Sequence, residues 1–109
     1  MHELSLVEEI IRISTAAAQG RSVRRVTLKV GALSCVMPEA LQFCFDSGKE
    51  GTVLAAAQLQ IERVPGEAEC HTCGQRYPLE ELYQPCPCGS CERSVLQGQE
   101  ILIQTLEYD

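Results

Sequence analysis

The residues of this chain best suited to chemistry are cysteines, five of which lie close together in its second half. They form the segments Cys70-His71-Thr72-Cys73 and Cys86-Pro87-Cys88-Gly89-Ser90-Cys91. A Cys-x-x-Cys pair lets one backbone turn present two sulfurs to a single ion, and Zn²⁺ binds four such ligands tetrahedrally. The residues between the two segments suffice for a hairpin that brings them together. We therefore expect a structural zinc site, whose four protein ligands leave no open position for catalysis.

Two other uses of clustered cysteines fit the sequence less well. A disulfide framework is typical of secreted domains, but seven cysteines is an odd number, and the segment from Met1 to Ser5 does not resemble a signal peptide. A redox pair of the thioredoxin type would require a βαβ pattern around Cys70, which the sequence lacks. No apolar run of about 18 residues predicts a membrane span. The cysteines therefore favour metal binding in a reducing, cytoplasmic compartment.

The composition is that of one small domain, or of one domain with a small metal-clamped lobe, in 109 residues. The net charge of −6 would repel nucleic-acid phosphates, so we expect no nucleic-acid partner and no membrane partner. The basic group Arg21, Arg24, Arg25 and Lys29 is more typical of a solvated strand face. No catalytic triad, paired catalytic carboxylates or phosphate-binding glycine loop is found, so we predict no enzymatic activity.

Hydrophobic periodicity predicts the elements that must position these residues. Apolar residues at three- and four-residue steps from Leu4 to Ala18 indicate a helix over 4–19. Alternation predicts strands over 23–33, 56–64 and 100–108. A short second helix begins at Pro38 and ends at Gly48 or Gly51.

We predict an α+β fold with a small three-stranded antiparallel sheet and two helices, plus an inserted zinc-ribbon-like lobe. The α/β domain comprises residues 1–66 and 95–109, and the inserted zinc-binding domain comprises residues 67–94. Because the inserted segment is poor in hydrophobic residues, the metal must substitute for a core there. Zinc binding contributes on the order of 10 kcal/mol or more in lobes of this kind.

A second candidate metal site lies at the other end, where His2 follows Met1 directly and precedes Glu3. A free terminal amine, the amide nitrogen of His2 and its imidazole can close fused chelate rings around one ion. Such nitrogen-rich, near-planar sites favour Ni(II) or Cu(II) over Zn²⁺. Taken alone, however, a histidine at position 2 is more typical of an uninvolved surface residue.

The start Met1-His2-Glu3, the order of elements and the late cysteine lobe together resemble the HypA/HybF family of nickel metallochaperones. The resemblance covers essentially the whole chain. It includes the segments Val30-Gly31-Ala32-Leu33-Ser34, Pro38-Glu39-Ala40-Leu41-Gln42-Phe43-Cys44-Phe45 and Gly98-Gln99-Glu100-Ile101. Each piece is weakly specific, whereas their order and spacing are highly specific.

The resemblance implies a non-enzymatic accessory protein for maturation of the [NiFe]-hydrogenase large subunit. It implies Ni(II) bound at Met1, His2 and Glu3 as cargo, and Zn(II) held structurally by two cysteine pairs. It also implies two partners, a HypB-type GTPase and the hydrogenase large-subunit precursor. A monomer and a homodimer both remain open.

One departure from the family pattern affects the zinc ligands. The family's second pair is normally Cys-Pro-x-Cys-Gly-Ser, whereas this chain is one residue shorter between Cys86 and Cys88. Cys70, Cys73 and Cys88 are therefore the secure ligands, and the fourth is Cys86, which keeps the family position, or Cys91, which restores a two-residue gap. The alternative to a nickel chaperone is a zinc-ribbon adaptor that joins proteins and carries no exchangeable metal.

Three further residues could bind metal but have simpler interpretations. His71 lies inside the first Cys-x-x-Cys pair, where a solvent-facing turn residue is expected. Cys35 and Cys44 resemble small buried hydrophobic residues, as free cysteines commonly are.

Overall fold

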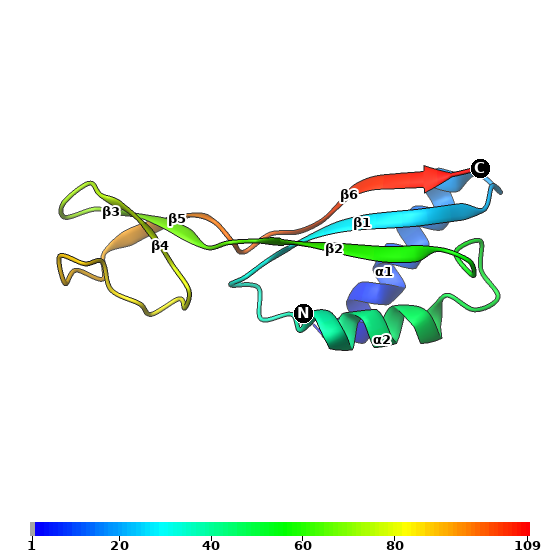
Figure 1. Cartoon of the computed structure of the whole chain (residues 1–109), viewed down its shortest axis with the longest axis horizontal. Helices are drawn as coiled ribbons and strands as arrows, with labels where there is room; N and C mark the ends of the chain where they lie inside the picture. The colour runs from blue at the N-terminus through cyan, green and yellow to red at the C-terminus, as the bar shows by residue number, and fades with distance from the viewer. Residues whose placement is uncertain (1) are drawn as a thin grey trace. The chain divides into compact units, whose positions relative to one another are not determined.

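A computed structural model describes residues 2–109 and contains two helices and six strands in that range. The helices are α1 (Glu3–Ala18) and α2 (Pro38–Gly48). The strands are β1 (Val23–Gly31), β2 (Gln58–Val64), β3 (Glu67–Cys70), β4 (Arg76–Pro78), β5 (Arg93–Gln97) and β6 (Ile101–Tyr108) (Figure 1). The predicted α+β class, with two helices, a three-stranded sheet and a cysteine lobe, is confirmed.

The larger sheet has the strand order β2-β1-β6 (Figure 1). Next to β2, the N–H of Val23 donates to Val53 at 2.9 Å and that of Ala32 to Val64 at 2.8 Å, so both strands advance in the same direction. β6 runs the opposite way, because Gly31 pairs with Glu100 at one end of β1 and Ser22 with Asp109 at the other. The sheet is therefore mixed, not wholly antiparallel as predicted. The reason is that α2 forms a crossover between β1 and β2, which returns the chain parallel to β1.

The chain divides into two compact units, of which the first comprises Met1–Leu28, Val36–Glu62 and Leu102–Asp109. Its core is aliphatic with one aromatic ring, and Val7, Val26, Leu41 and Phe45 are essentially fully buried. α1 and α2 contact closely at Gly48, where an added Cβ would lie 3.3 Å from Val7. Leu4, expected on the buried face of α1, is instead 47% exposed, because the face of α1 that packs on this core consists of Leu6, Val7, Ile10, Ser14 and Ala18.

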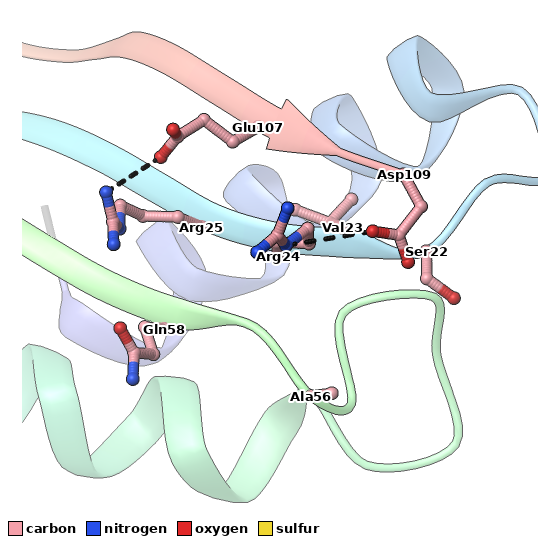
Figure 2. A pocket seen from close by; sticks show the side chains of 8 residues that line it. All are labelled: Ser22, Val23, Arg24, Arg25, Ala56, Gln58, Glu107 and Asp109. Carbon is pink, nitrogen blue, oxygen red and sulfur yellow. Dashed lines mark ion pairs between the residues drawn. The ribbon is translucent and has the colours of Figure 1, made fainter.

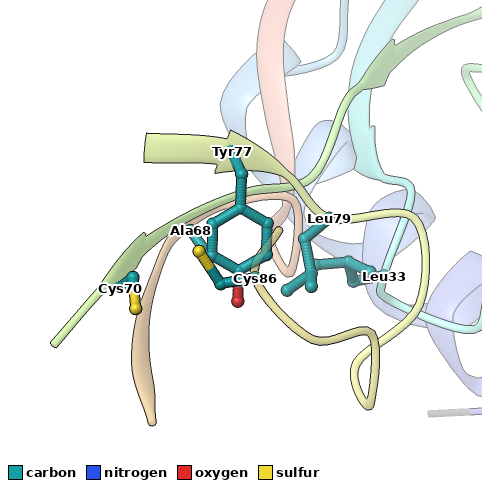
Figure 3. Close-up of a cluster of buried hydrophobic side chains, with 6 residues drawn as sticks. All are labelled: Leu33, Ala68, Cys70, Tyr77, Leu79 and Cys86. Carbon is teal, nitrogen blue, oxygen red and sulfur yellow. The ribbon is translucent and has the colours of Figure 1, made fainter. Parts of the chain in front are cut away.

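The second unit comprises Lys29–Cys35 and Arg63–Ile101 and contains its own antiparallel sheet, β4-β3-β5. Its core is small. It consists of Leu33, Ala68, Cys70, Tyr77, Leu79 and Cys86, with Val95 packed against it. Figure 3 shows the ring of Tyr77 in the middle of this cluster, with the two cysteines to one side and the two leucines to the other.

This unit is wider than the predicted 67–94 insertion, because the segment after β1 also packs into it. Leu33 contributes to the core, and its N–H donates to Gly98 at 2.7 Å. Close backbone contact explains two glycines here. A Cβ on Gly31 would lie 2.0 Å from the carbonyl oxygen of Gly98, and one on Gly66 would lie 2.0 Å from that of Leu79. Among the described residues, no helix is long and apolar enough to cross a membrane.

Candidate metal centre

Two short turns present the sulfurs of the second unit. Cys70 ends β3, and the turn after it is closed by the N–H of Gly74, which donates to Cys70 at 3.0 Å. The second turn follows β4, where the N–H of Gly89 donates to Cys86 at 2.7 Å. Both glycines adopt positive φ, 75° and 94°, a conformation that residues with a Cβ rarely adopt. The two turns therefore resemble each other despite the shorter Cys86–Cys88 spacing.

The turns bring four sulfurs together. The Sγ atoms of Cys70, Cys73, Cys86 and Cys88 all lie within 4.8 Å of one another. The contacts across the two turns, Cys70 to Cys88 and Cys73 to Cys86, are both 3.7 Å. A tetrahedral zinc site with Zn–S bonds of about 2.3 Å has S–S edges of about 3.8 Å, so the cluster fits structural zinc. Cys91 is exposed and does not belong to this group.

Side chains around the sulfurs connect the two turns directly. The hydroxyls of Thr72 and Ser90 form a hydrogen bond of 2.8 Å between the turns, and within the second turn the backbone N–H of Cys86 donates to the carbonyl of Ser90 at 2.9 Å. The imidazole Nε2 of His71 lies 2.6 Å from the hydroxyl of Ser94, so this ring is engaged away from the sulfur group. Sequence reasoning missed Thr72 and Ser90, because a contact between two loops 18 residues apart leaves no local pattern.

The four thiols differ in acidity because they share hydrogen bonds and charge. The backbone N–H of Cys73 is the main cause that lowers the pKa of Cys70 to about 6. At Cys73 and Cys86, backbone N–H groups also act to lower the pKa. Loss of hydration and hydrogen bonds to neighbouring thiols outweigh them, so the pKa of Cys73 is raised and that of Cys86 reaches about 12. One thiolate thus forms readily, whereas further thiolates require a cation in the cluster.

The predicted nickel ligands lie at the start of the first unit. Met1 is outside the described residues. His2 is exposed and is the N-cap of α1, where its Nδ1 accepts a hydrogen bond of 3.2 Å from the backbone N–H of Leu4. Glu3 is the first residue of the helix and is half-buried. No contact in the described residues tests whether these groups bind one ion, so this assignment stays a prediction.

Two basic residues of β1, Arg24 and Arg25, pair with acids in a pocket of about 490 Å³. Figure 2 shows Arg25 directed at Glu107, with 3.0 Å between their charged atoms, and Arg24 directed at Asp109 at 3.7 Å. The guanidinium of Arg21 lies 4.1 Å from the centre of the Tyr108 ring. These positive charges therefore have partners within the same unit.

The other cysteines lie apart from the sulfur group. Cys35 is exposed, contrary to prediction, and adopts a positive φ of 64° in the turn after β1. In this segment Leu33 and Val36 take the buried positions, and Cys35 lies between them with its side chain at the surface. Cys44 is half-buried on α2.

Comparison with known proteins places the whole chain in one family. Residues 1–108 match the family described as HypA, hydrogenase/urease nickel incorporation, metallochaperone. The chain is 42% identical over 110 residues to the hydrogenase maturation factor HypA of Geobacter metallireducens, covering 100% of both proteins. It is also 42% identical over 109 residues to the HypA of a Nostoc species, covering 100% of this chain and 96% of that protein.

A solved structure agrees with the sequence comparisons. The solution structure of the nickel metallochaperone HypA from Helicobacter pylori matches with a TM-score of 0.71 and 26% identity, covering 99% of this chain and 97% of that one. The predicted family is thus confirmed, together with its association with nickel. With a four-sulfur cluster that fits structural zinc and a family match along essentially its whole length, this chain belongs to the HypA family of nickel-incorporation metallochaperones.

Proposed function

We propose that this protein binds Ni(II) at Met1, His2 and Glu3 and helps to insert it into the large subunit of a [NiFe]-hydrogenase. The observation that carries this proposal is His2 itself. Its imidazole is exposed at the start of α1 in a chain that belongs to a nickel-handling family. When Met1 carries a free amine, that amine, the His2 amide and the imidazole offer three nitrogens, and Glu3 adds a carboxylate. This donor set suits the tetragonal geometry that Ni(II) prefers.

We propose that the second metal, Zn(II), is held permanently by Cys70, Cys73, Cys86 and Cys88. The sulfur separations of 3.7 Å match a tetrahedral site, and the core around them contains few large side chains. A bound zinc ion would stabilise this unit and neutralise thiolates that otherwise repel one another. With all four positions filled by protein, the ion has no place for a substrate, so its role is structural.

The two proposed sites have different roles, because zinc is bound permanently whereas nickel is bound for delivery. Four thiolates bind zinc too tightly for exchange during delivery, whereas an exposed chelate can pass its ion to an acceptor with more ligands. A micromolar site corresponds to about 8 kcal/mol, which a few additional ligands in the acceptor can exceed. We therefore assign nickel to the first unit, which contains the N-terminal residues of the predicted α/β domain (1–66 and 95–109), and zinc to the second unit, which contains the predicted insertion of residues 67–94.

The chain would act without catalysing a reaction itself. Its sequence has no P-loop, so any GTP hydrolysis during delivery would come from a HypB-type GTPase partner. The acceptor would be the hydrogenase large-subunit precursor. Assembly and delivery would take place in the cytoplasm, where a reducing environment keeps the seven cysteines available as thiols.

Metal stoichiometry of the purified, untagged protein tests this function. We expect one tightly bound zinc and one exchangeable nickel per chain. His2→Ala, or an extension before Met1, should abolish nickel binding and leave zinc unchanged, as measured by calorimetry and elemental analysis. His71→Ala is the matched control, because this imidazole is bonded to Ser94 and should not affect nickel. Nickel affinity that survives both changes would refute the site, and zinc without any nickel would favour the adaptor function.

A further inference from the structure

We infer that nickel uptake removes the N-cap of α1, so that loading the N-terminal site loosens the first turn of this helix. The inference rests on the proposed nickel site and concerns how that site is regulated. It starts from one contact, in which Nδ1 of His2 accepts the backbone N–H of Leu4 at 3.2 Å. His2 has the extended backbone of a cap residue, with φ −70° and ψ 138°.

The chelate and the cap require the same lone pair. A ring closed through the amide nitrogen of His2 and its own imidazole has six members if Nδ1 binds the ion, whereas Nε2 lies on the far side of the imidazole. A neutral imidazole has only one unprotonated nitrogen, and each such nitrogen has one lone pair in the plane of the ring. Nδ1 therefore cannot bind nickel and accept the Leu4 N–H at the same time.

The cap also prepares the ring for the ion. Because Nδ1 accepts a hydrogen bond, the proton of the neutral ring lies on Nε2, and this tautomer leaves Nδ1 free to bind metal once the cap opens. His2 is exposed, so the ring can turn from the helix to an ion without crossing packed side chains. The cap therefore keeps the neutral ring in the tautomer that can bind metal through Nδ1.

Competition between the helix cap and the ion weakens nickel binding and favours nickel release. The first N–H groups of a helix have no partner within the helix, so Leu4 loses the side-chain acceptor that His2 provides when nickel binds. A typical N-cap changes the equilibrium constant for forming the capped helix about fivefold. Nickel affinity should be reduced by this factor, and re-formation of the cap should favour release to an acceptor.

A serine at position 4 tests the competition, because once the first turn has loosened its hydroxyl can cap a helix that begins at residue 5, by accepting the N–H of residue 6 or 7, and nickel does not occupy this cap. Leu4 is 47% exposed, so its replacement leaves the core intact. The backbone N–H of residue 4 remains, and the His2 cap therefore survives in the metal-free protein. Leu4→Ala is the matched control, since it removes the same side chain but alanine caps poorly.

Nickel titrated into untagged protein by calorimetry should bind about fivefold more tightly to Leu4→Ser than to Leu4→Ala. Solvent exchange of the residue 4 amide, followed by NMR in the wild-type protein, should accelerate on nickel loading. Equal affinities of the two variants, with an amide that exchanges no faster, would overturn the inference and leave the nickel site intact. Nickel affinity that survives His2→Ala would instead refute the site itself, and the inference with it.

Discussion

Substitution of Cys86 and of Cys91 by serine decides which of them completes the zinc site. Cys86 is buried with its sulfur 3.7 Å from that of Cys73, whereas Cys91 is exposed and outside the group of four. Structural zinc contributes about 10–16 kcal/mol through four ligands. One sulfur therefore accounts for about 3–4 kcal/mol, which is about a hundredfold to a thousandfold in zinc affinity.

The assay is competition for zinc against a chromogenic chelator, together with thermal unfolding of each variant. Cys86→Ser should lose zinc to the chelator and should unfold the second unit at a lower temperature, because its core is too small to replace the ion. Cys91→Ser should retain zinc with wild-type affinity. Serine is close to cysteine in size, so the comparison reports the sulfur and not the packing.

Two results would refute this reasoning. If Cys91→Ser lost zinc as strongly as Cys86→Ser, both thiols would belong to the site and the four-sulfur cluster would be incomplete. If Cys86→Ser kept its zinc and only Cys91→Ser lost it, the fourth ligand would be Cys91, which is separated from Cys88 by two residues. A double variant that binds zinc far more weakly than Cys86→Ser would show that Cys91 replaces the missing sulfur.

Two further predictions concern protons and packing in the second unit. Zinc binding at pH 7 should release at least two protons, because the pKa values of Cys73 and Cys86 are raised and both must become thiolates. Zinc affinity should then rise about a hundredfold per pH unit near neutrality, and calorimetry in buffers of different ionisation enthalpy would contradict this if it found no proton release. Gly66→Ala should destabilise the same unit by about 3 kcal/mol or more, since its Cβ would lie 2.0 Å from the carbonyl of Leu79. Gly74→Ala, whose Cβ meets nothing within 4 Å, is strained only by its positive φ, by about 1–2 kcal/mol, and should lower the unfolding temperature less.

Local patterns predicted most of the elements. The helix that begins at Pro38 and ends at Gly48 follows from a proline at its first position and a glycine at its end. β1, β2 and β6 follow from the alternation of apolar and polar residues in the sequence, although the central strand β1 also buries Thr27 of its predicted polar face. The direction of β2 was not predictable in this way, because alternation is the same in parallel and antiparallel strands. The strands β3, β4 and β5 have four, three and five residues, which is too few for their alternation to stand out in the sequence.

The candidate metal centre was also predicted only in part from local sequence patterns. Spacing alone indicates that cysteines of this lobe bind zinc, since few other arrangements bring so many sulfurs to adjacent turns. It favours Cys86, which keeps the family position, but leaves Cys91 as an alternative, because both lie close enough to Cys88 to share its turn. The tertiary structure separates them, since only the first of the two lies across from Cys73.

The sequence by itself determined the family, the class of fold and the kinds of metal ligand, because residue type and short spacing carry that information. Only the tertiary structure decided which sulfurs meet, that Leu33 packs in the core of the cysteine unit, and that the imidazole of His2 caps α1. The first two contacts join residues far apart along the chain with no regular spacing, and the cap depends on where α1 begins. Their free energy comes from packing and hydrogen bonds that exist only once the chain has folded.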